Sequence, residues 1–510
     1  MSPSESSSAD PVTGTPPLFK NYIGGEWIAR GSQGVFDNFN PARTDDVVGT
    51  FPKSGKDEVD AAVRKAKEAL KSWSATPAPH RGAILSRAGD LLTHHKEELS
   101  RLMTREMGKV LLETRGDVQE AIDTCYFFAG EGRRLYGQTT PSELPNKMAM
   151  TLRRPIGVCG LISPWNFPMA IPSWKICPAL ICGNTMVFKP ASDTPASATR
   201  FVEILEQAGL PKGVLNLVHG SGETVGEAII SHPDVSLISF TGSTEVGRHI
   251  SAKAGAALKR VSLEMGGKNC QIVMDDADLE LAVEGAIWGA FGTTGQRCTA
   301  TSRLIIHRMV IEEFTAKLIA GIRKLRLGDG LDEASQVGPL VNERQREKVD
   351  RFVKIGQRED KAKLLCGGGP EVIGKLKKGF FYHPTVFGEC TSTMQICQEE
   401  IFGPVTCIIP IRDFEEAIAV ANNVRYGLSA SIFTRDVNLA YRAMYELETG
   451  INYINASTIG AEVHLPFGGV KDTGNGHREG GIQALDIFSE WKTVYADFSG
   501  KLQRAQIDGN

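Results

Sequence analysis

The sequence lacks the cysteine patterns of a disulfide-bonded or zinc-binding protein. Its ten cysteines are scattered over 510 residues, with no C-x-x-C pair and no short cysteine–histidine spacing. Disulfide frameworks and structural zinc sites both depend on such clustering. We therefore expect free thiols, no bound metal and a reducing compartment, the cytoplasm.

An excess of charge of one sign is also missing. Lys and Arg number 57, Asp and Glu number 60, and the formal net charge is -3. Proteins that bind nucleic acid or anionic membranes usually carry a basic patch, whereas the basic residues here are spread along the chain. We expect no nucleic-acid or membrane partner and take a small molecule as the ligand.

Long uninterrupted apolar runs are absent as well. The stretch 1–16 is rich in Ser and Pro and has no apolar core of signal-peptide length, so we expect a disordered arm. The most apolar region, 156–188, is interrupted by several prolines and by Lys175, which a lipid-spanning helix would not readily accommodate. This region is interpreted as buried protein interior.

What the chain does have is an alternation of strand and helix patterns. Apolar residues recur at helical spacing over 56–102, and another helix is expected over about 112–135. Short apolar runs then alternate with helical patterns over 156–258, and a second such series runs from about 269 to 461. This rhythm predicts an α/β fold with two parallel sheets.

Two glycine-containing turns are candidates for phosphate binding. In SFTGSTEVG, Gly242 and Gly247 follow an apolar strand and open a helix, where backbone N–H groups can hold a pyrophosphate. The spacing departs from G-x-G-x-x-G, and Ser243 or Thr244 could simply cap the helix. A second turn, HGSGETVG with Gly222, strengthens the nucleotide interpretation.

Lys189 stands at the exit of a strand, where Pro190 ends it. Its ammonium would project over the carboxyl edge of a sheet, the place where nucleotides bind. The alternative is an ordinary solvated lysine. Similarly, Glu400 and Phe402 in QEEIFGPV could bind ribose hydroxyls and pack against a flat base, or Glu400 could be a charge in the first turn of a helix.

The most informative stretch is GQRCTA, which contains Cys298. The thiol follows a Gly- and Thr-rich approach and stands beside Arg297, a cation expected to favour the thiolate. A free cysteine is more often inert core, and Glu264, which leaves an apolar strand, is more often solvated or paired when taken alone. Together they suggest a nucleophile and a base that activates water against a thioester.

Asn166 in SPWNFPMA is a candidate donor to an oxyanion, acting with the backbone N–H of Cys298. The alternative is an Asx turn between prolines. Cys298, Glu264 and Asn166 would together supply the nucleophile, the base and the oxyanion donor of an acyl-transfer site.

These motifs resemble the aldehyde dehydrogenase superfamily. PWNFP, FKPA, FTGSTEVG, LEMGGKN, GQRCTA, EEIFGPV and PFGGVKDTGNGHRE occur in the order of the family, and Cys298 stands 34 residues after Glu264, as in that family. The resemblance covers about 19–495. It implies oxidation of an aldehyde to a carboxylic acid through a cysteine thiohemiacetal and thioester, with NAD or NADP as the cofactor.

The resemblance also implies an α/β architecture with a Rossmann-like dinucleotide-binding domain, an α/β catalytic domain and a protruding β oligomerisation element, in a homodimer or homotetramer. A C-terminal tail beyond the usual family end could cover a subunit interface or the site entrance. The implied division is 17–136 and 156–266 for the dinucleotide domain, 267–464 for the catalytic domain, 137–155 and 487–497 for the oligomerisation element, and 498–510 for the tail.

Site residues are carried over from the same resemblance. Cys298 would be the nucleophile, Asn166 the oxyanion donor and Glu264 the base that releases the acid. Lys175 and Glu479 match positions of a proton relay, although His477 looks like a one-residue insertion before Glu479. The implied cofactor contacts are Ile162, Pro164, Trp165, Lys189, Ser192, Gly222, Phe240, Gly242, Ser243, Gly247, Glu400 and Phe402.

Cofactor preference and substrate are less defined. Ser192 stands where many NAD-preferring relatives have a glutamate, so NADP should be tolerated and even preferred. Arg297 and Glu120 resemble residues with which antiquitin-like relatives bind α-aminoadipic semialdehyde, and Phe467 is a third expected substrate contact. Gly292 replaces the arginine typical of succinic-semialdehyde enzymes, and Arg134 is either a carboxylate partner or a solvated helix end.

Two other function classes fit these residues less well. A non-catalytic relative would not need Cys298, Glu264 and Asn166 together. A phosphorylating or coenzyme-A-acylating relative commonly lacks the glutamate base, so Glu264 favours water as the second nucleophile.

Overall fold

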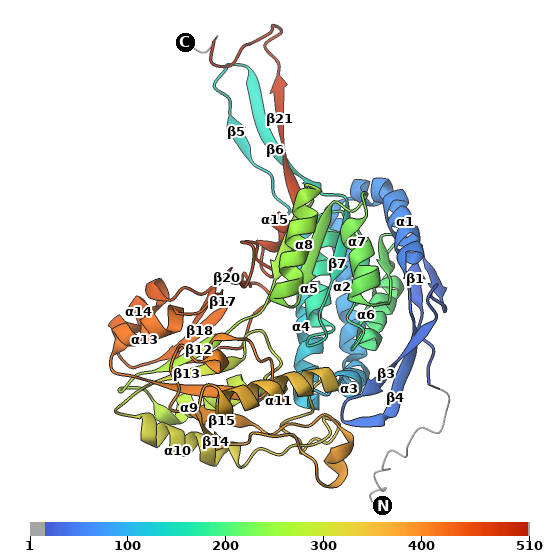
Figure 1. Cartoon of the computed structure of the whole chain (residues 1–510). Helices are drawn as coiled ribbons and strands as arrows, with labels where there is room; N and C mark the ends of the chain where they lie inside the picture. The colour runs from blue at the N-terminus through green and yellow to red at the C-terminus, as the bar shows by residue number, and fades with distance from the viewer. Residues whose placement is uncertain (1–15, 508–510) are drawn as a thin grey trace, which may run out of the picture.

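The computed structural model describes residues 16–507, in two lobes from which a narrow sheet projects (Figure 1). The strand order is β11-β10-β7-β8-β9-β1-β2 in the first lobe and β14-β15-β16-β13-β12-β18-β19 in the second. Most neighbouring strands run parallel, and helices cover the sheets. The predicted α/β fold is confirmed. The arm predicted over 1–16 lies outside the described residues except for Pro16.

The central strands of the first sheet are buried along their whole length, as expected for parallel strands covered on both faces. Their carboxyl ends meet at one edge, and this edge carries the residues predicted to bind the cofactor. The bounds are β1 (Asn21–Ile23), β2 (Glu26–Ile28), β7 (Val158–Ile162), β8 (Thr185–Lys189), β9 (Leu215–Leu217), β10 (Leu237–Thr241) and β11 (Arg260–Glu264).

Two apolar cores hold helices against the two faces of this sheet. One joins α2, α4, α5 and α6 to one face, and the other joins α1, α7 and α8 to the opposite face. The helix predicted to end near 135 stops at Glu131. The bounds are α1 (Lys56–Ala75), α2 (Ala78–His94), α3 (Lys96–Met107), α4 (Leu111–Glu131), α5 (Ala170–Ile181), α6 (Pro195–Gln207), η1 (Gly222–Gly226), α7 (Glu227–Ser231) and α8 (Thr244–Ala256).

The second lobe repeats this construction in the later half of the chain. Its central strands are equally buried, and α9 and α10 pack on one face. The strands are β12 (Asn269–Val273), β13 (Thr301–His307), β14 (Lys363–Cys366), β15 (Thr385–Gly388), β16 (Val405–Ile411), β18 (Ser429–Phe433) and β19 (Ile451–Ile454). The helices are α9 (Leu279–Phe291), η2 (Gly292–Gly295), α10 (Ile311–Ile322), α11 (Glu343–Arg358), η3 (Gly374–Lys378), α12 (Gln395–Gln398), α13 (Phe414–Asn422) and α14 (Val437–Glu446).

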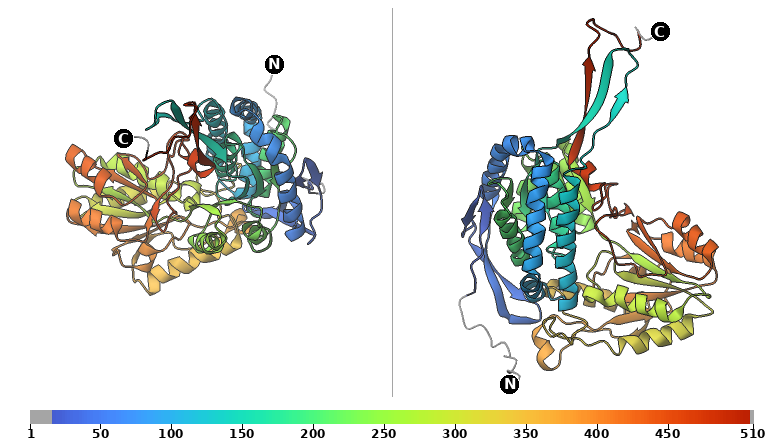
Figure 2. Two further views of the ribbon diagram at one scale, coloured as in Figure 1. Left: turned by 90° about the horizontal axis from the view of Figure 1, so that it is seen from above. Right: turned by 180° about the vertical axis from the view of Figure 1, so that it is seen from behind.

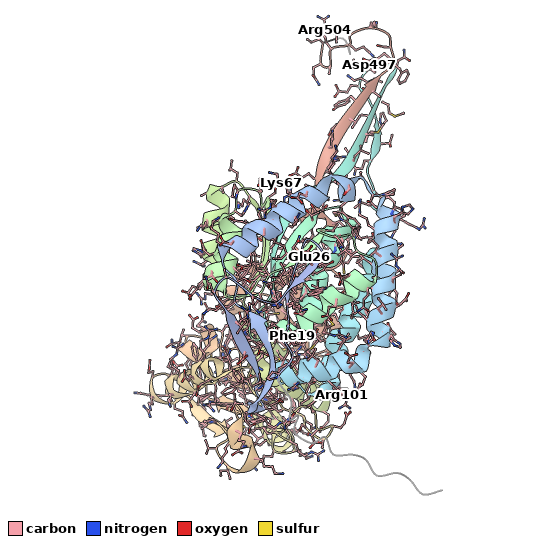
Figure 3. All side chains as sticks on the ribbon, turned by 90° about the vertical axis from the view of Figure 1, so that its right-hand side faces the viewer. Phe19, Glu26, Lys67, Arg101, Asp497 and Arg504 are labelled. Carbon is pink, nitrogen blue, oxygen red and sulfur yellow. The ribbon has the colours of Figure 1, made fainter. Side chains whose placement is uncertain are left out.

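The projecting sheet joins two distant parts of the chain. β21 (Ser489–Asp497) pairs antiparallel with β6 (Lys147–Pro155), which pairs with β5 (Thr139–Pro141). Figure 2 shows this sheet standing away from both lobes, and Figure 3 places Asp497 and Arg504 at its far end. The remaining elements are a hairpin, a short strand pair and one helical turn: β3 (Val35–Asn40), β4 (Arg43–Pro52), β17 (Tyr426–Gly427), β20 (Val470–Lys471) and α15 (Ala484–Ile487).

None of the described helices combines the length and the apolar character that a membrane crossing requires.

Candidate functional site

A cleft of about 690 Å³ lies between the two lobes. The first lobe supplies the ends of β7, β10 and β11 with the start of α8, and the second supplies α11 and the segments around Cys298 and Glu400. Predicted site residues in its lining are Pro164, Trp165, Asn166, Gly242, Ser243, Cys298, Glu400 and Phe402. The fold therefore brings the candidate nucleophile and much of the candidate cofactor site to one opening.

The backbone before Cys298 adopts an unusual conformation. Thr293 and Thr294 have φ of 52° and 57°, in the left-handed region that side chains other than glycine rarely occupy. The turn is held from outside, because Thr293 N–H donates to Glu113 Oε1 at 2.6 Å and Thr294 Oγ1 donates to Gly338 O at 3.0 Å. After this turn the chain presents Cys298, half-buried, to the cleft.

The expectation that Arg297 favours the thiolate of Cys298 is wrong for this structure. Burial, and then the carboxylates of Glu400 and Glu264, raise the pKa of the thiol to about 12. The guanidinium of Arg297 points elsewhere: its Nε donates to Thr293 Oγ1 at 2.8 Å, and it lies over the rings of Trp288 and Phe167. Adjacency in sequence did not place the cation beside the sulfur.

Asn166 is buried in the wall of the same cleft. Its Nδ2 donates to Gln296 O at 3.0 Å, two residues before the thiol. A side-chain amide has two N–H donors, so one hydrogen fixes the side chain and the second can serve an oxyanion formed at Cys298.

Glu264 ends β11 as a buried carboxylate. Among residues 16–507, neither of its oxygens has a hydrogen-bond partner. Burial and then the charge of Glu479 raise its pKa well above the ordinary value, while Lys175 acts in the opposite direction. A buried, unpaired carboxylate with a raised pKa is a suitable general base.

Lys175 on α5 and Glu479 form a buried ion pair close to Glu264. Lys175 Nζ also donates to Ser239 Oγ at 3.1 Å. The segment containing Glu479 is fixed by backbone bonds in both directions with Phe467, at 2.5 and 2.7 Å. His477, which looks like an inserted residue, therefore does not prevent Glu479 from reaching Lys175.

The first-lobe cofactor candidates lie along the carboxyl edge of the sheet. Ser243 caps α8 by accepting from Val246 N–H at 3.4 Å. A β-carbon on Gly242 would lie 2.5 Å from the ring of Phe240, and one on Gly247 would lie 2.3 Å from Met265 Sδ. Both glycines thus pack closely against neighbouring side chains where the strand turns into the helix.

A second group lies beyond the lining of that cleft, toward β8 and β9. Burial lowers the pKa of Lys189 to about 8, and its Nζ donates to Pro190 O at 2.8 Å. Ser192 Oγ donates to Gly220 O at 3.1 Å, and Gly222 opens η1 after Ser221. Ile162 ends β7 and hydrogen-bonds within the sheet. The described cleft does not include these residues, although they share its edge.

Glu400 and Phe402 are held in place from the second lobe. Glu400 Oε1 accepts from Gly267 N–H at 2.9 Å, and the ring of Phe402 meets Trp165 edge-on at 5.3 Å. Phe402 has φ of 61°, and its carbonyl accepts from Gln345 Nε2 at 2.7 Å. Gln345 belongs to α11. The sequence did not predict that this helix lines the cleft, because its local pattern is simply that of a polar helix. The residues of α11 that line the cleft are Arg344, Gln345, Glu347, Lys348 and Arg351.

Two of the expected substrate contacts, Arg297 and Glu120, are close enough to interact electrostatically, and the third, Phe467, packs against another ring. Glu120 on α4 lies within electrostatic reach of Lys109 and Arg297, and burial raises its pKa to about 8. Phe467 packs against Trp174 with ring centroids 4.9 Å apart. Arg134 is exposed and is paired with Glu131 at 2.6 Å, as a solvated helix end would be.

Comparison with known proteins agrees with this geometry. The Aldehyde dehydrogenase family profile matches residues 27–494. The chain is 42% identical to Alpha-ketoglutaric semialdehyde dehydrogenase of Bacillus subtilis over 94% of this chain and 98% of that protein. Betaine aldehyde dehydrogenase of Staphylococcus aureus, solved with NAD+, superposes with a TM-score of 0.92 at 34% identity, covering 95% of this chain and 96% of that one.

An NADP-dependent enzyme of Escherichia coli is also similar, with a TM-score of 0.90 at 39% identity, covering 94% of this chain and 98% of that one. The chain belongs to the aldehyde dehydrogenase family. The resemblance identified from its motifs is confirmed.

Proposed function

We propose that this chain oxidises an aldehyde to a carboxylic acid with NAD or NADP, using Cys298 as the nucleophile. The observation that carries the proposal is the cleft in which Cys298 and Asn166 meet, with the unpaired carboxylate of Glu264 close enough to shift the pKa of the thiol. A thiol alone would be ordinary, but a thiol, an amide donor and a buried base form the parts of a two-step acyl transfer.

In the first step the thiol of Cys298 releases its proton to solvent, and the resulting thiolate adds to the carbonyl carbon to form a thiohemiacetal oxyanion. The second N–H of Asn166 Nδ2 and the backbone N–H of Cys298 stabilise the oxyanion. A dinucleotide held at the carboxyl edge of the first sheet would supply the hydride acceptor for this thiohemiacetal. The product on the protein is a thioester of Cys298.

In the second step Glu264 takes a proton from water, and the resulting hydroxide attacks the thioester. The acid leaves and the thiol is restored. The pair Lys175–Glu479 adjoins Glu264 and can carry the proton onward, since it is buried and already hydrogen-bonded to Ser239. The high pKa of Cys298 keeps the free enzyme in the less reactive thiol form.

The carboxyl edge of the first sheet suits a dinucleotide. The start of α8 is a helix N-terminus of the kind that suits a pyrophosphate, and Gly242 and Gly247 let the backbone pack where a β-carbon would come close to Phe240 and Met265. Lys189 and Ser192 lie at the neighbouring strand end. No carboxylate stands at position 192 to repel a 2'-phosphate, which supports the use of NADP as well as NAD.

We further propose that the substrate carries a carboxylate. Arg297 precedes the nucleophile, and its ion pair with Glu113 is long, with 3.6 Å between Glu113 Oε1 and its Nη2, so a substrate carboxylate can compete for the guanidinium. With its pKa raised to about 8, Glu120 is largely protonated at neutral pH and does not repel an anion. The similarity to an Alpha-ketoglutaric semialdehyde dehydrogenase supports the same class; α-aminoadipic and succinic semialdehydes are the other carboxylated candidates.

An uncharged or cationic aldehyde is the second candidate, because a Betaine aldehyde dehydrogenase is also similar. A panel of aldehydes with carboxylate, neutral and quaternary-ammonium ends, assayed with NAD and with NADP, tests the proposal. We expect the carboxylated series to have the highest kcat/KM. Product analysis with and without coenzyme A separates hydrolysis from acyl transfer, and formation of an acyl-coenzyme A would contradict the role of Glu264.

We also propose the division into domains and the assembly that the family resemblance implies. The sheets support a dinucleotide domain over 17–136 and 156–266 and a catalytic domain over 267–464. The projecting sheet would pair with a second copy through its edge strand β21 in a homodimer or homotetramer, in the cytoplasm. In the tail, Gln503 Nε2 donates to Pro145 O at 2.8 Å. Removing residues 498–510 and measuring mass and activity tests whether the tail covers an interface.

A further inference from the structure

Three cysteines lie together inside the second lobe. Cys390 follows β15, Cys397 lies on α12 and Cys407 on β16. All three are buried, and their sulfur atoms lie within 4.8 Å of one another. The proposed oxidation uses none of them. The group could not be predicted from the sequence, because its members come from three elements at spacings that match no metal-binding motif.

The distances suit three sulfurs around one soft cation. With zinc–sulfur bonds of about 2.3 Å, sulfurs at the corners of a triangle are about 4 Å apart, so the three side chains need to close by less than about 1 Å. Thiolates select soft cations over Mg²⁺ and Ca²⁺. The ligand type and the spacing therefore agree on the class of ion.

The charges around the three sulfurs also suit a thiolate site. Lys268 is buried, and within residues 16–507 its Nζ has no hydrogen-bond partner. Burial lowers the pKa of Lys268, and the sulfurs of Cys407 and Cys397 act to raise it. A divalent cation with three thiolates has a net charge of minus one, which the ammonium of Lys268 would neutralise. Such compensation is what a buried charge requires.

Two of the three thiols face backbone carbonyl oxygens. Cys390 Sγ donates to Gly388 O at 3.5 Å, and Cys407 Sγ donates to Ile396 O at 3.7 Å. Metal binding must displace these protons, since thiolate is the ligand. The exchange leaves the oxidation state of sulfur unchanged: each S–H bond is replaced by a sulfur–metal bond, and a proton goes to solvent.

We propose that Cys390, Cys397 and Cys407 form a binding site for a thiophilic divalent d10 cation, with Zn²⁺ and Cd²⁺ as its probes. The bound ion would link β15, α12 and β16 at the core of the second lobe. The site is separate from the aldehyde chemistry and does not depend on it.

Cadmium binding in a Cys298→Ala background tests the site, because that substitution removes the reactive thiol of the cleft. The protein is incubated with Cd²⁺, passed through gel filtration and analysed for bound metal and for thiolate-to-cadmium absorption in the ultraviolet. We expect one Cd²⁺ per chain. Adding Cys397→Ala or Cys407→Ala should weaken retention at least tenfold, whereas Cys270→Ala, which removes an equally buried thiol of the same sheet, should leave it unchanged.

Proton release gives an independent measurement that does not rely on a core substitution. A weakly buffered indicator should report proton release when Cd²⁺ binds to the Cys298→Ala chain. Cys390→Ser, placed in a loop, is the milder variant if an α12 or β16 substitution prevents folding, as judged by circular dichroism. Absence of retained Cd²⁺, equal retention in the Cys390→Ser chain, or binding without proton release would overturn the proposal.

Discussion

Gly468 packs directly against Glu264: a β-carbon built on the glycine would lie 2.7 Å from Oε1 of the carboxylate. Gly468 also has φ of 150°, a conformation that favours glycine. The position of the proposed base thus depends on a residue without a side chain, more than 200 positions later in the sequence.

Gly468→Ala should therefore displace the carboxylate and slow acid release by about tenfold or more, because small misplacements of a reacting group are costly. The effect should appear in kcat under conditions where hydrolysis of the thioester limits turnover. Gly460→Ala is the matched control, since Gly460 also has positive φ but no atom lies within 4 Å of the added carbon. Equal losses in both variants would assign the effect to backbone strain alone.

Substitution of the two reacting residues should separate the two steps. Cys298→Ser should lower turnover by a factor on the order of 10⁴, as removal of a nucleophile does elsewhere. Glu264→Gln should still give a burst of reduced cofactor and then stop. Intact-protein mass spectrometry should show the acyl adduct on Glu264→Gln, and steady turnover without an adduct would refute the assignment.

Alkylation of the free enzyme should follow the raised pKa of Cys298. Because that pKa is about 12, the thiolate fraction and the rate with iodoacetamide should keep rising with pH between about 7 and 10. Glu400→Gln removes a negative charge that opposes ionisation, so the pKa should fall and the rate at pH 8 should rise about three- to tenfold. Glu399→Gln is the control, because Glu399 is paired with Arg425 at 2.7 Å. A slower reaction in Glu400→Gln would mean that the charge of Glu400 does not raise the pKa of Cys298, and would reject this explanation.

Ser192→Glu should convert a chain that accepts NADP into one that prefers NAD. A carboxylate at this position would repel the 2'-phosphate, and we expect kcat/KM with NADP to fall at least about tenfold while the value with NAD changes little. Steady-state kinetics with both cofactors checks this. Ser72→Glu, the same substitution at an exposed position of α1, should affect neither value.

Arg297→Ala should raise KM for carboxylated aldehydes about 10- to 100-fold, the range expected for losing a charged hydrogen bond. An uncharged aldehyde of the same length should be affected far less. Arg134→Ala is the control, since that side chain is exposed and bound to Glu131. If Arg134→Ala gave the larger effect, the carboxylate would bind at the other arginine.

The elements that carry the site were predictable because their signals are local. Continuous apolar runs ending in Ile162, Lys189 and Glu264 marked buried strands, and a parallel sheet places their ends at one edge. Glycine before a helix marked the turn at Gly242. Each of these predictions needed only a few neighbouring residues.

What could not be predicted was the direction of side chains set by distant contacts. Arg297 stands next to Cys298 in sequence, yet Thr293 and two aromatic rings hold its guanidinium away from the sulfur. The cleft wall formed by α11 and the cluster of three buried cysteines could not be predicted for the same reason. They result from the packing of elements far apart in the chain, which no short motif encodes.

The ion pair between Lys175 and Glu479 joins residues 304 positions apart, one inside an early helix and the other close to the last strand. Catalytic competence should consequently be among the last properties to return when the denatured chain refolds. Samples with native-like circular dichroism but no turnover would then be intermediates in which the closing segment has not yet docked, and an activity assay would report on completion of the fold more strictly than spectroscopy does.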